Sequence, residues 1–139
     1  MSENDGMSIL EFLEARISED EHYANNARGL LGNPNPWSEW RTLTKWYDAI
    51  SRADAMHIER QSPSRVMAEC GAKRSIIAEH TPVDFSGIGM KSPNACSRCG
   101  ADLNMHDWDW TEDSFPCQTL RAVAAVYADH PDYQQEWSQ

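Results

Sequence analysis

The chain carries the stretch Asn94-Ala95-Cys96-Ser97-Arg98-Cys99-Gly100, in which two cysteines lie two residues apart. Two thiolates at this spacing can hold one tetrahedral ion from a tight turn. Gly100 fits such a turn, because the backbone after the second cysteine often needs a positive φ. The stretch therefore has the form of a zinc knuckle, and we expect a small fold that is stapled by a bound Zn²⁺ ion.

A third cysteine, Cys117, follows in the segment Phe115-Pro116-Cys117. The proline favours a helix start there, and the helix dipole at that position favours a thiolate. We therefore predict that Cys96, Cys99 and Cys117 bind the ion. The alternatives are ordinary thiols with Cys117 in the core, or a redox pair. A redox pair should be preceded by a strand and followed directly by a helix, whereas Gly100 and a run of acids follow here.

The fourth predicted ligand is His80, which ends a predicted helix and precedes a 15-residue connection to Cys96. That connection is long enough to fold back and bring the imidazole to the ion. Three other side chains stay open as alternatives for this position, namely His130, His106 and Cys70. A small buried thiol is the simpler role for Cys70.

Three helices are predicted from capping signals and from apolar side chains at helical spacing. The first covers residues 8–27 and starts at the capping box Ser8-Ile9-Leu10-Glu11. The second covers residues 62–80 and starts at Ser62-Pro63, and the third starts at residue 115 and ends near residue 128. The predicted buried faces consist of Ile9, Phe12, Leu13 and Ile17, of Val66, Met67, Cys70 and Ile77, and of Leu120, Val123, Ala124 and Tyr127.

Residues 37–50 fit two kinds of structure. Trp37, Trp40, Tyr47 and Ile50 lie near helical spacing, which favours a helix, but the aromatic and threonine content also suits a hairpin. We therefore predict a mainly α fold, or an α+β fold with a short hairpin.

We predict that the chain forms a small single domain over residues 1–139. Residues 1–7 form a flexible tail in this prediction, and residues 94–128 form the zinc knuckle and the C-terminal helix.

Composition limits the classes of protein that remain. The 139 residues suit one domain, and an apolar content of 40% is not that of a disordered chain. No stretch approaches the ~20 apolar residues that span a bilayer. The polar start Met1 to Gly6 lacks the features of a signal peptide, so we expect a cytoplasmic protein whose thiols stay reduced.

The charge balance argues against nucleic acid as a partner. Twelve basic and 22 acidic residues give a net charge of −10, which a phosphate backbone repels. The run from Asp102 to Asp113 holds five acidic residues and no lysine or arginine. A solvated acidic face is the expected role of this run, and mimicry of a nucleic acid is the alternative.

Several stretches of the chain form recognisable motifs. They are His57-Ile58-Glu59-Arg60, Ser62-Pro63-Ser64-Arg65-Val66, Ala72-Lys73-Arg74 through His80, the Cys96 and Cys99 pair, Pro116-Cys117-Gln118-Thr119-Leu120-Arg121 and Tyr127-Ala128-Asp129-His130-Pro131-Asp132-Tyr133, together with the N-terminal helix and Pro34-Asn35-Pro36-Trp37. In these stretches the chain resembles a family of small actinobacterial and actinophage proteins that is known only as a domain of unknown function. The resemblance is weakest over Ser38 to Ala53, where members look strand-like. It implies a cytoplasmic accessory protein of a bacterial or phage-infected host cell with the same metal site, and it leaves His57 and His130 as secondary candidates.

Three functions follow from these features, and the sequence favours the first. The first function is that of a zinc-stabilised module that binds a protein partner. No catalytic activity is evident in the sequence, and the alternative that the chain is an enzyme stays open. The second is a zinc hydrolase or deaminase, suggested by His57-Ile58-Glu59 before Cys96 and Cys99, but Pro93 lies three residues before Cys96 instead of one. The third is an acidic inhibitor that mimics nucleic acid. Four protein ligands on the ion would indicate a structural role, and three ligands plus water would indicate chemistry.

Overall fold

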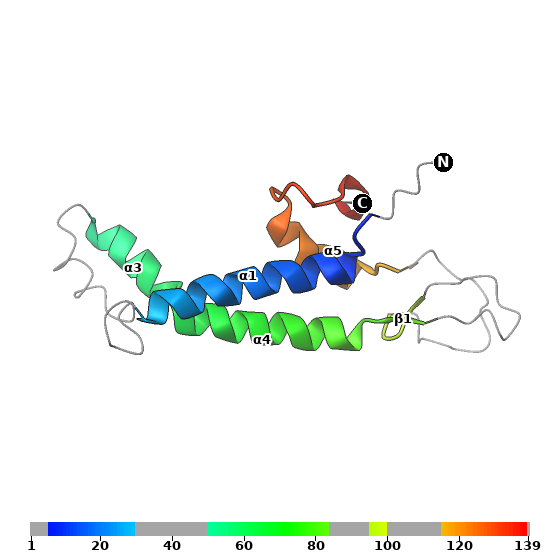
Figure 1. The fold of residues 1–139 in the computed structure, drawn as a ribbon, viewed down its shortest axis with the longest axis horizontal. Coiled ribbons are helices and arrows are strands. Elements are labelled where there is room, and N and C mark those ends of the chain that lie inside the picture. Colours follow the sequence, from blue (N-terminus) through cyan, green and yellow to red (C-terminus); the bar gives the residue numbers. More distant parts are fainter. Residues whose placement is uncertain (1–5, 30–49, 84–94, 100–114, 139) are drawn as a thin grey trace, which may run out of the picture. The chain divides into compact units, whose positions relative to one another are not determined.

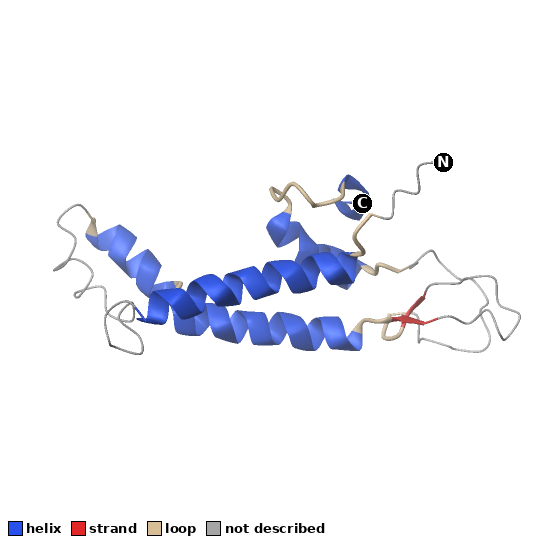
Figure 2. Cartoon of the chain, viewed as in Figure 1, coloured by secondary structure: helices blue, strands red, loops and turns tan. Residues whose placement is uncertain are grey.

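The computed structural model describes residues 6–29, 50–83, 95–99 and 115–138, and these residues are mostly helical (Figure 2). The mainly α prediction is confirmed in this part of the chain. The helix or hairpin predicted for residues 37–50 lies, apart from Ile50, outside it. The elements in chain order (Figure 1) are α1 at Ile9–Gly29, α3 at Arg52–Arg60, α4 at Pro63–Glu79, β1 at Pro82–Val83, β2 at Ala95–Cys96, α5 at Gln118–Ala124, and the 3₁₀ turns η2 at Ala125–Tyr127 and η3 at Gln135–Ser138.

The chain divides into two compact units. Unit 1 consists of Met1–Arg16 and Lys73–Gln139, and unit 2 consists of Ile17–Ala72. Both α1 and α4 contribute residues to each unit, since residues 16 and 17 lie within α1 and residues 72 and 73 lie within α4. The single domain over residues 1–139 stays a prediction.

The start of α1 is set by the predicted capping box. The Ser8 backbone N–H donates to Glu11 Oε2 at 2.9 Å, and the Glu11 backbone N–H donates to Ser8 Oγ at 3.3 Å. Each side chain thus satisfies an orphan backbone donor of the first turn. The helix continues to Gly29, two residues beyond the predicted end at residue 27. The whole predicted stripe is buried, with exposed fractions of 3% or less for Ile9, Phe12, Leu13 and Ile17.

Helix α4 begins and ends within one residue of the prediction. Pro63 takes the first helical position, and the Val66 N–H donates to the Ser62 carbonyl at 3.0 Å. Of the four side chains predicted to face inward, Cys70 is buried, whereas Val66, Met67 and Ile77 are half-buried.

Helix α3 was not expected from the sequence. Its start is a second capping box, in which the Asp54 N–H donates to Ser51 Oγ at 3.1 Å and the Ser51 N–H donates to Asp54 Oδ2 at 3.3 Å. A capping box usually has glutamate or glutamine at this position, and here the shorter aspartate accepts the same hydrogen bond from the N-cap backbone N–H. Ala55 is the buried residue of this helix.

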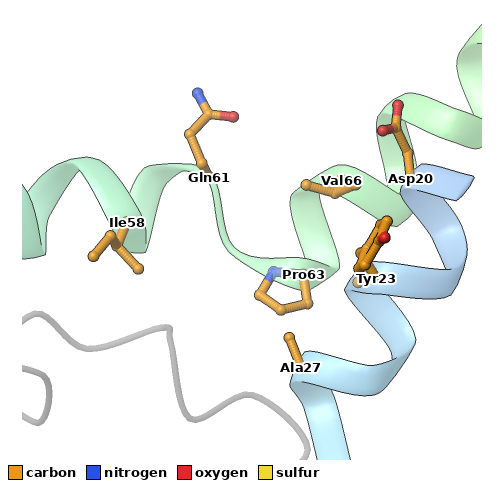
Figure 3. Close-up of a pocket in the computed structure, with 8 residues that line it drawn as sticks. Asp20, Tyr23, Ala27, Ile58, Gln61, Pro63 and Val66 are labelled. Atoms are coloured by element: carbon orange, nitrogen blue, oxygen red, sulfur yellow. The ribbon is translucent and has the colours of Figure 1, made fainter.

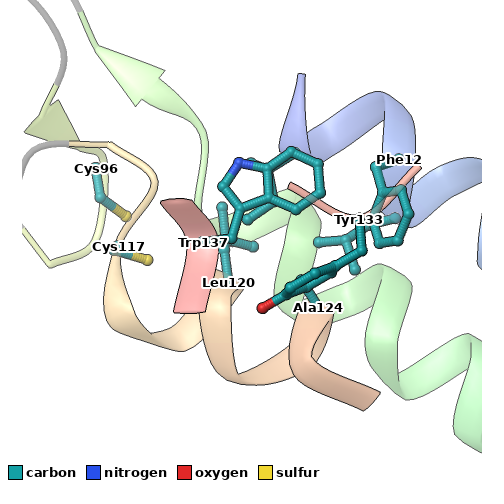
Figure 4. Close-up of a cluster of buried hydrophobic side chains, with 9 residues drawn as sticks. Phe12, Cys96, Cys117, Leu120, Ala124, Tyr133 and Trp137 are labelled. Atoms are coloured by element: carbon teal, nitrogen blue, oxygen red, sulfur yellow. The ribbon is translucent and has the colours of Figure 1, made fainter. Parts of the chain in front are cut away.

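The core of unit 1 is built on Phe12 and on two aromatic residues near the C-terminus. The Phe12 ring centroid lies 5.0 Å from that of Trp137 and 5.9 Å from that of Tyr133. Figure 4 shows Cys96 and Cys117 at one end of this cluster and Phe12 and Tyr133 at the other. The buried members are Ile9, Phe12, Leu13, Cys96, Cys117, Leu120, Ala124, Tyr133 and Trp137.

A buried arginine ties α1 to the C-terminal segment of unit 1. Arg16 Nη1 lies 2.9 Å from His130 Nδ1 and 3.5 Å from Asp132 Oδ2, and the arginine residue is 7% exposed. A guanidinium can only donate, so His130 Nδ1 is the acceptor. The backbone N–H of Asp132 also donates to this nitrogen, at 3.1 Å.

Candidate metal centre

Four potential ligand side chains meet in unit 1. The ligand atoms of His80, Cys96, Cys99 and Cys117 all lie within 4.8 Å of one another. His80 Nδ1 is 3.3 Å from Cys96 Sγ and 3.5 Å from the sulfur atoms of both Cys99 and Cys117. All the cysteines are free thiols, so no disulfide competes for these sulfur atoms. The cluster could hold a metal ion.

A short strand pair brings the turn from Cys96 to Cys99 to the end of α4. Strands β1 and β2 pair antiparallel, with Pro82 opposite Cys96 and Val83 opposite Ala95. This short pair is visible as two red arrows in Figure 2. Because β1 begins two residues after His80, the pairing places Cys96 beside the segment that carries the imidazole.

Ser97 fixes the same connection through hydrogen bonds to Glu79 and Thr81. Its backbone N–H donates to the Thr81 carbonyl at 2.8 Å, and its hydroxyl donates to the Glu79 carbonyl at 2.8 Å. The Thr81 N–H donates to Ser97 Oγ at 3.1 Å. These bonds lie on either side of His80 and next to Cys96, so Ser97 holds the two ligands in register. The role of Ser97 is not predicted above, although its hydroxyl between Cys96 and Cys99 was the available signal in the sequence.

The predicted helix start at residue 115 is wrong, because α5 begins at Gln118 and Cys117 precedes its first turn. Cys117 is the N-cap residue of α5, with φ −71° and ψ 165°, and its side chain makes no capping hydrogen bond. The sulfur is therefore available to the cluster, and it is almost fully buried at 1% exposure. An Arg121 Nε bond to the Pro116 carbonyl at 2.9 Å holds the turn in front of it.

The thiols of Cys96 and Cys99 differ in acidity. Burial raises the pKa of Cys96, but hydrogen bonds from the backbone N–H groups of Cys99 and Arg98, together with side-chain hydrogen bonds to His80 and Cys117, outweigh this and lower the pKa to about 7. Partial desolvation and the neighbouring sulfur atoms of Cys117 and Cys96 raise the pKa of Cys99 to about 11. Negative charges crowded into one site oppose further ionisation, and a bound cation would remove this opposition.

The other candidate ligands have different surroundings. The His130 imidazole accepts from Arg16 and from a backbone N–H. Cys70 is buried, with its sulfur 3.8 Å from the Ile17 carbonyl oxygen. His57 is an exposed residue of α3 and is not a member of the cluster. His106 lies outside the described residues, as does the acidic run from residue 102 to residue 113.

A pocket of about 400 Å³ lies in unit 2 (Figure 3). It is formed by the last turns of α1, the end of α3 and the start of α4. Among the described residues of the lining, Asp20 is the one charged side chain, and none is a histidine or a cysteine. This part of the lining is therefore mostly apolar. Its lining consists of Asp20, Tyr23, Ala24, Ala27, Ile58, Gln61, Pro63 and Val66.

Comparison with known proteins identifies a family. A family model described as a family of unknown function matches residues 6–139. This confirms the predicted resemblance to an uncharacterised domain family. The comparison with curated proteins and the comparison with solved structures each give no match. Among the described helices, none has the length and apolar character needed to cross a membrane.

Proposed function

This chain belongs to the family of unknown function DUF6221, and we propose that it is a zinc-stabilised accessory module that binds another protein. The observation that carries the proposal is the cluster of His80, Cys96, Cys99 and Cys117. Its donor set, its spacing and its ligand count each support a structural zinc ion.

The donor set favours zinc. Three thiolates and one imidazole are soft and borderline ligands, which suit Zn²⁺ and disfavour Mg²⁺ or Ca²⁺. The turn from Cys96 to Cys99 supports a zinc knuckle, because the backbone N–H groups of Arg98 and Cys99 donate to Cys96 sulfur. Such bonds stabilise the thiolate form, which is the form that binds metal.

The spacing supports tetrahedral coordination. With Zn–S bonds of about 2.3 Å, Zn–N bonds of about 2.05 Å and a tetrahedral angle, the nitrogen and sulfur ligands of one zinc ion should lie about 3.6 Å apart. His80 Nδ1 lies 3.3 to 3.5 Å from the three sulfur atoms. The imidazole thus already has nearly the separation from each sulfur that a shared ion requires.

The ligand count supports a structural ion. Four protein ligands fill a tetrahedron and leave no position for water, whereas hydrolytic zinc sites keep one position open. A deaminase would use the histidine of His57-Ile58-Glu59 as a ligand. His80, in place of His57, stands with the cysteines, and this favours structure over chemistry. A cytoplasmic location follows from the proposal, because a reducing compartment keeps the thiols available to the ion.

Protein binding is the task that we assign to the surface. Tyr23 on α1 is 73% exposed and lines the apolar pocket of unit 2, and Met56 on α3 is 41% exposed. Exposed aromatic and methionine side chains are typical of protein contact sites, and Tyr23 borders an apolar depression. A photo-crosslinking amino acid at position 23 should capture a defined protein that the same group at the exposed Glu69 does not capture.

Metal analysis tests the proposal. Protein made without added zinc should contain about one zinc ion per chain, as expected for one tetrahedral site. Cys117→Ser should lose the ion and much of the ~10 kcal/mol or more that a structural zinc can add to folding. The matched control Cys70→Ser should keep the ion and lose only ~1–3 kcal/mol. Wild-type protein with well under half an equivalent of metal, or equal losses of stability in the two variants, would contradict a structural zinc site.

A further inference from the structure

The three sulfur atoms of the metal centre belong to residues that differ sharply in exposure. Cys96 and Cys117 are each 1% exposed and belong to the core of unit 1. Cys99 is exposed, at the end of the knuckle turn. A water-soluble reagent therefore reaches one sulfur of the site before the other two.

From this asymmetry we propose that the site is a peroxide-sensitive switch, in which oxidation of Cys99 releases the zinc ion. The inference rests on the proposed zinc site and names its regulation. A thiol that coordinates a metal is deprotonated, and oxidation selects thiolates that are accessible to solvent. Cys99 in the loaded site meets both conditions, whereas Cys70 is a buried thiol outside the metal cluster.

The chemistry needs hydrogen peroxide and two thiolates. The Cys99 thiolate attacks one peroxide oxygen, so that an S–O bond forms, the O–O bond breaks and hydroxide leaves, which takes up a proton to become water. The thiolate of Cys96 or Cys117, whose sulfur lies within 4.8 Å, then attacks the sulfenic sulfur. An S–S bond forms, the S–O bond breaks, and a second hydroxide leaves and is protonated. The two sulfur atoms lose two electrons, the peroxide gains them, and two protons are consumed.

Loss of two thiolates removes half of the donor set. The ion then keeps only one cysteine and His80, which do not complete a tetrahedral structural site. The ligands come from three segments of unit 1: Cys96 lies in β2, Cys117 directly precedes α5, and His80 directly follows α4. Release of the ion therefore frees these three segments from one another. A thiol reductant with added zinc should restore the site, because sulfenic acid and disulfide are the reversible steps of cysteine oxidation.

The test uses the zinc-loaded full-length chain and hydrogen peroxide. A colorimetric chelator should report release of all the bound zinc, and peptide mapping should find Cys99 in the first disulfide formed. Cys70→Ser should release zinc at the wild-type rate. Cys99→His, which supplies a ligand that cannot form a disulfide, should retain its zinc under the same treatment.

Each failure has a different meaning. Wild-type protein that carries no zinc before treatment defeats the proposed function itself. Zinc that is bound but stays bound in peroxide overturns only the switch, as does a first disulfide between Cys96 and Cys117. Equal release from wild type and Cys99→His also overturns it. If Cys99→His does not bind zinc, the order of disulfide formation in wild type still decides.

Discussion

Two histidines of unit 1 have different neighbours, which suit them to different roles. His80 presents Nδ1 to three sulfur atoms at 3.3 to 3.5 Å. His130 presents Nδ1 to Arg16 at 2.9 Å and to a backbone N–H at 3.1 Å. The sequence left both open as metal ligands, and the structure surrounds only His80 with other potential ligands.

The first prediction compares these two residues. His80→Ala should bind zinc weakly and lose it rapidly to a colorimetric chelator, because one of four ligands is gone. His130→Ala should hold zinc as wild type does but should lose about 1–3 kcal/mol of stability, since Arg16 loses an acceptor in a buried position. Release rates in His80→Ala that match wild type would remove it from the ligand set, and rapid release from His130→Ala alone would move the ligand there.

The different acidities of the Cys96 and Cys99 thiols lead to a second prediction, about the pH dependence of zinc binding. In metal-free protein the Cys99 thiol, with its pKa raised to about 11, holds its proton at neutral pH. Zinc must displace this proton and that of any other protonated thiol ligand, so acid opposes binding and the affinity should rise at least about tenfold per pH unit from about pH 7 to about pH 9. Cys96, with a pKa of about 7, should steepen the dependence below that range. Chelator competition, corrected for protonation of the chelator, measures this, and an affinity independent of pH would contradict it.

At the scale of the element, the sequence predicts what local signals determine. The capping box at Ser8 and the Ser62-Pro63 pair located α1 and α4 to within two residues, because side-chain and backbone groups a few positions apart fix helix ends. The C-x-x-C spacing with Cys117 and His80 predicted a cluster that could hold a metal ion for a similar reason, since ligand chemistry restricts the choice of residues. Those four residues are the ones that the structure brings together.

The features that the sequence did not predict depend on contacts between distant residues or on unusual variants of a local sequence signal. Tyr133 and Trp137 are core residues because they pack on Phe12, more than 100 residues earlier in the chain, and no local pattern reports this. Helix α3 was missed because aspartate replaces the longer acid in its capping box. The C-terminal helix was predicted too long, since α5 ends at Ala124 and tightens into the 3₁₀ turn η2.

The α3 capping box supports a third prediction. Ser51→Ala should destabilise the protein by about 1 kcal/mol, because an orphan N–H at the helix start loses its acceptor. Ser64→Ala, an exposed substitution inside the first turn of α4, serves as the matched control and should change stability by less than about 0.5 kcal/mol. Urea denaturation measures both, and equal effects would show that the Ser51 cap contributes little.

For the whole molecule, the division into two units would give a metal ion bound at the candidate centre a local effect. All four candidate ligands belong to unit 1, and the residues of α3 belong to unit 2. The free energy of zinc binding, about 10–16 kcal/mol in small zinc domains, should therefore stabilise unit 1 in particular. Unit 2 has its own buried residues, among them Ala55 and Cys70.

The fourth prediction follows from that division. A strong chelator should abolish hydrogen-exchange protection in β2 and α5, whereas α3 should keep most of its protection. Mass spectrometry of peptides from zinc-loaded and stripped protein measures the difference, and readdition of zinc is the control. A uniform loss of protection across both units would show that they unfold together.

The order of the two units along the chain also has a consequence for protein synthesis. Unit 2 is one continuous stretch, Ile17–Ala72, whereas unit 1 joins Met1–Arg16 to Lys73–Gln139. A growing polypeptide folds segment by segment from its N-terminal end at about 5–20 residues per second. Unit 2 can therefore fold early on the ribosome, whereas the apolar face of Phe12 and Leu13 is completed only when Tyr133 and Trp137 emerge, more than 100 residues later. During this interval that face is open to chaperones and to aggregation, so the core of unit 1 depends on translation of the segment that carries Tyr133 and Trp137.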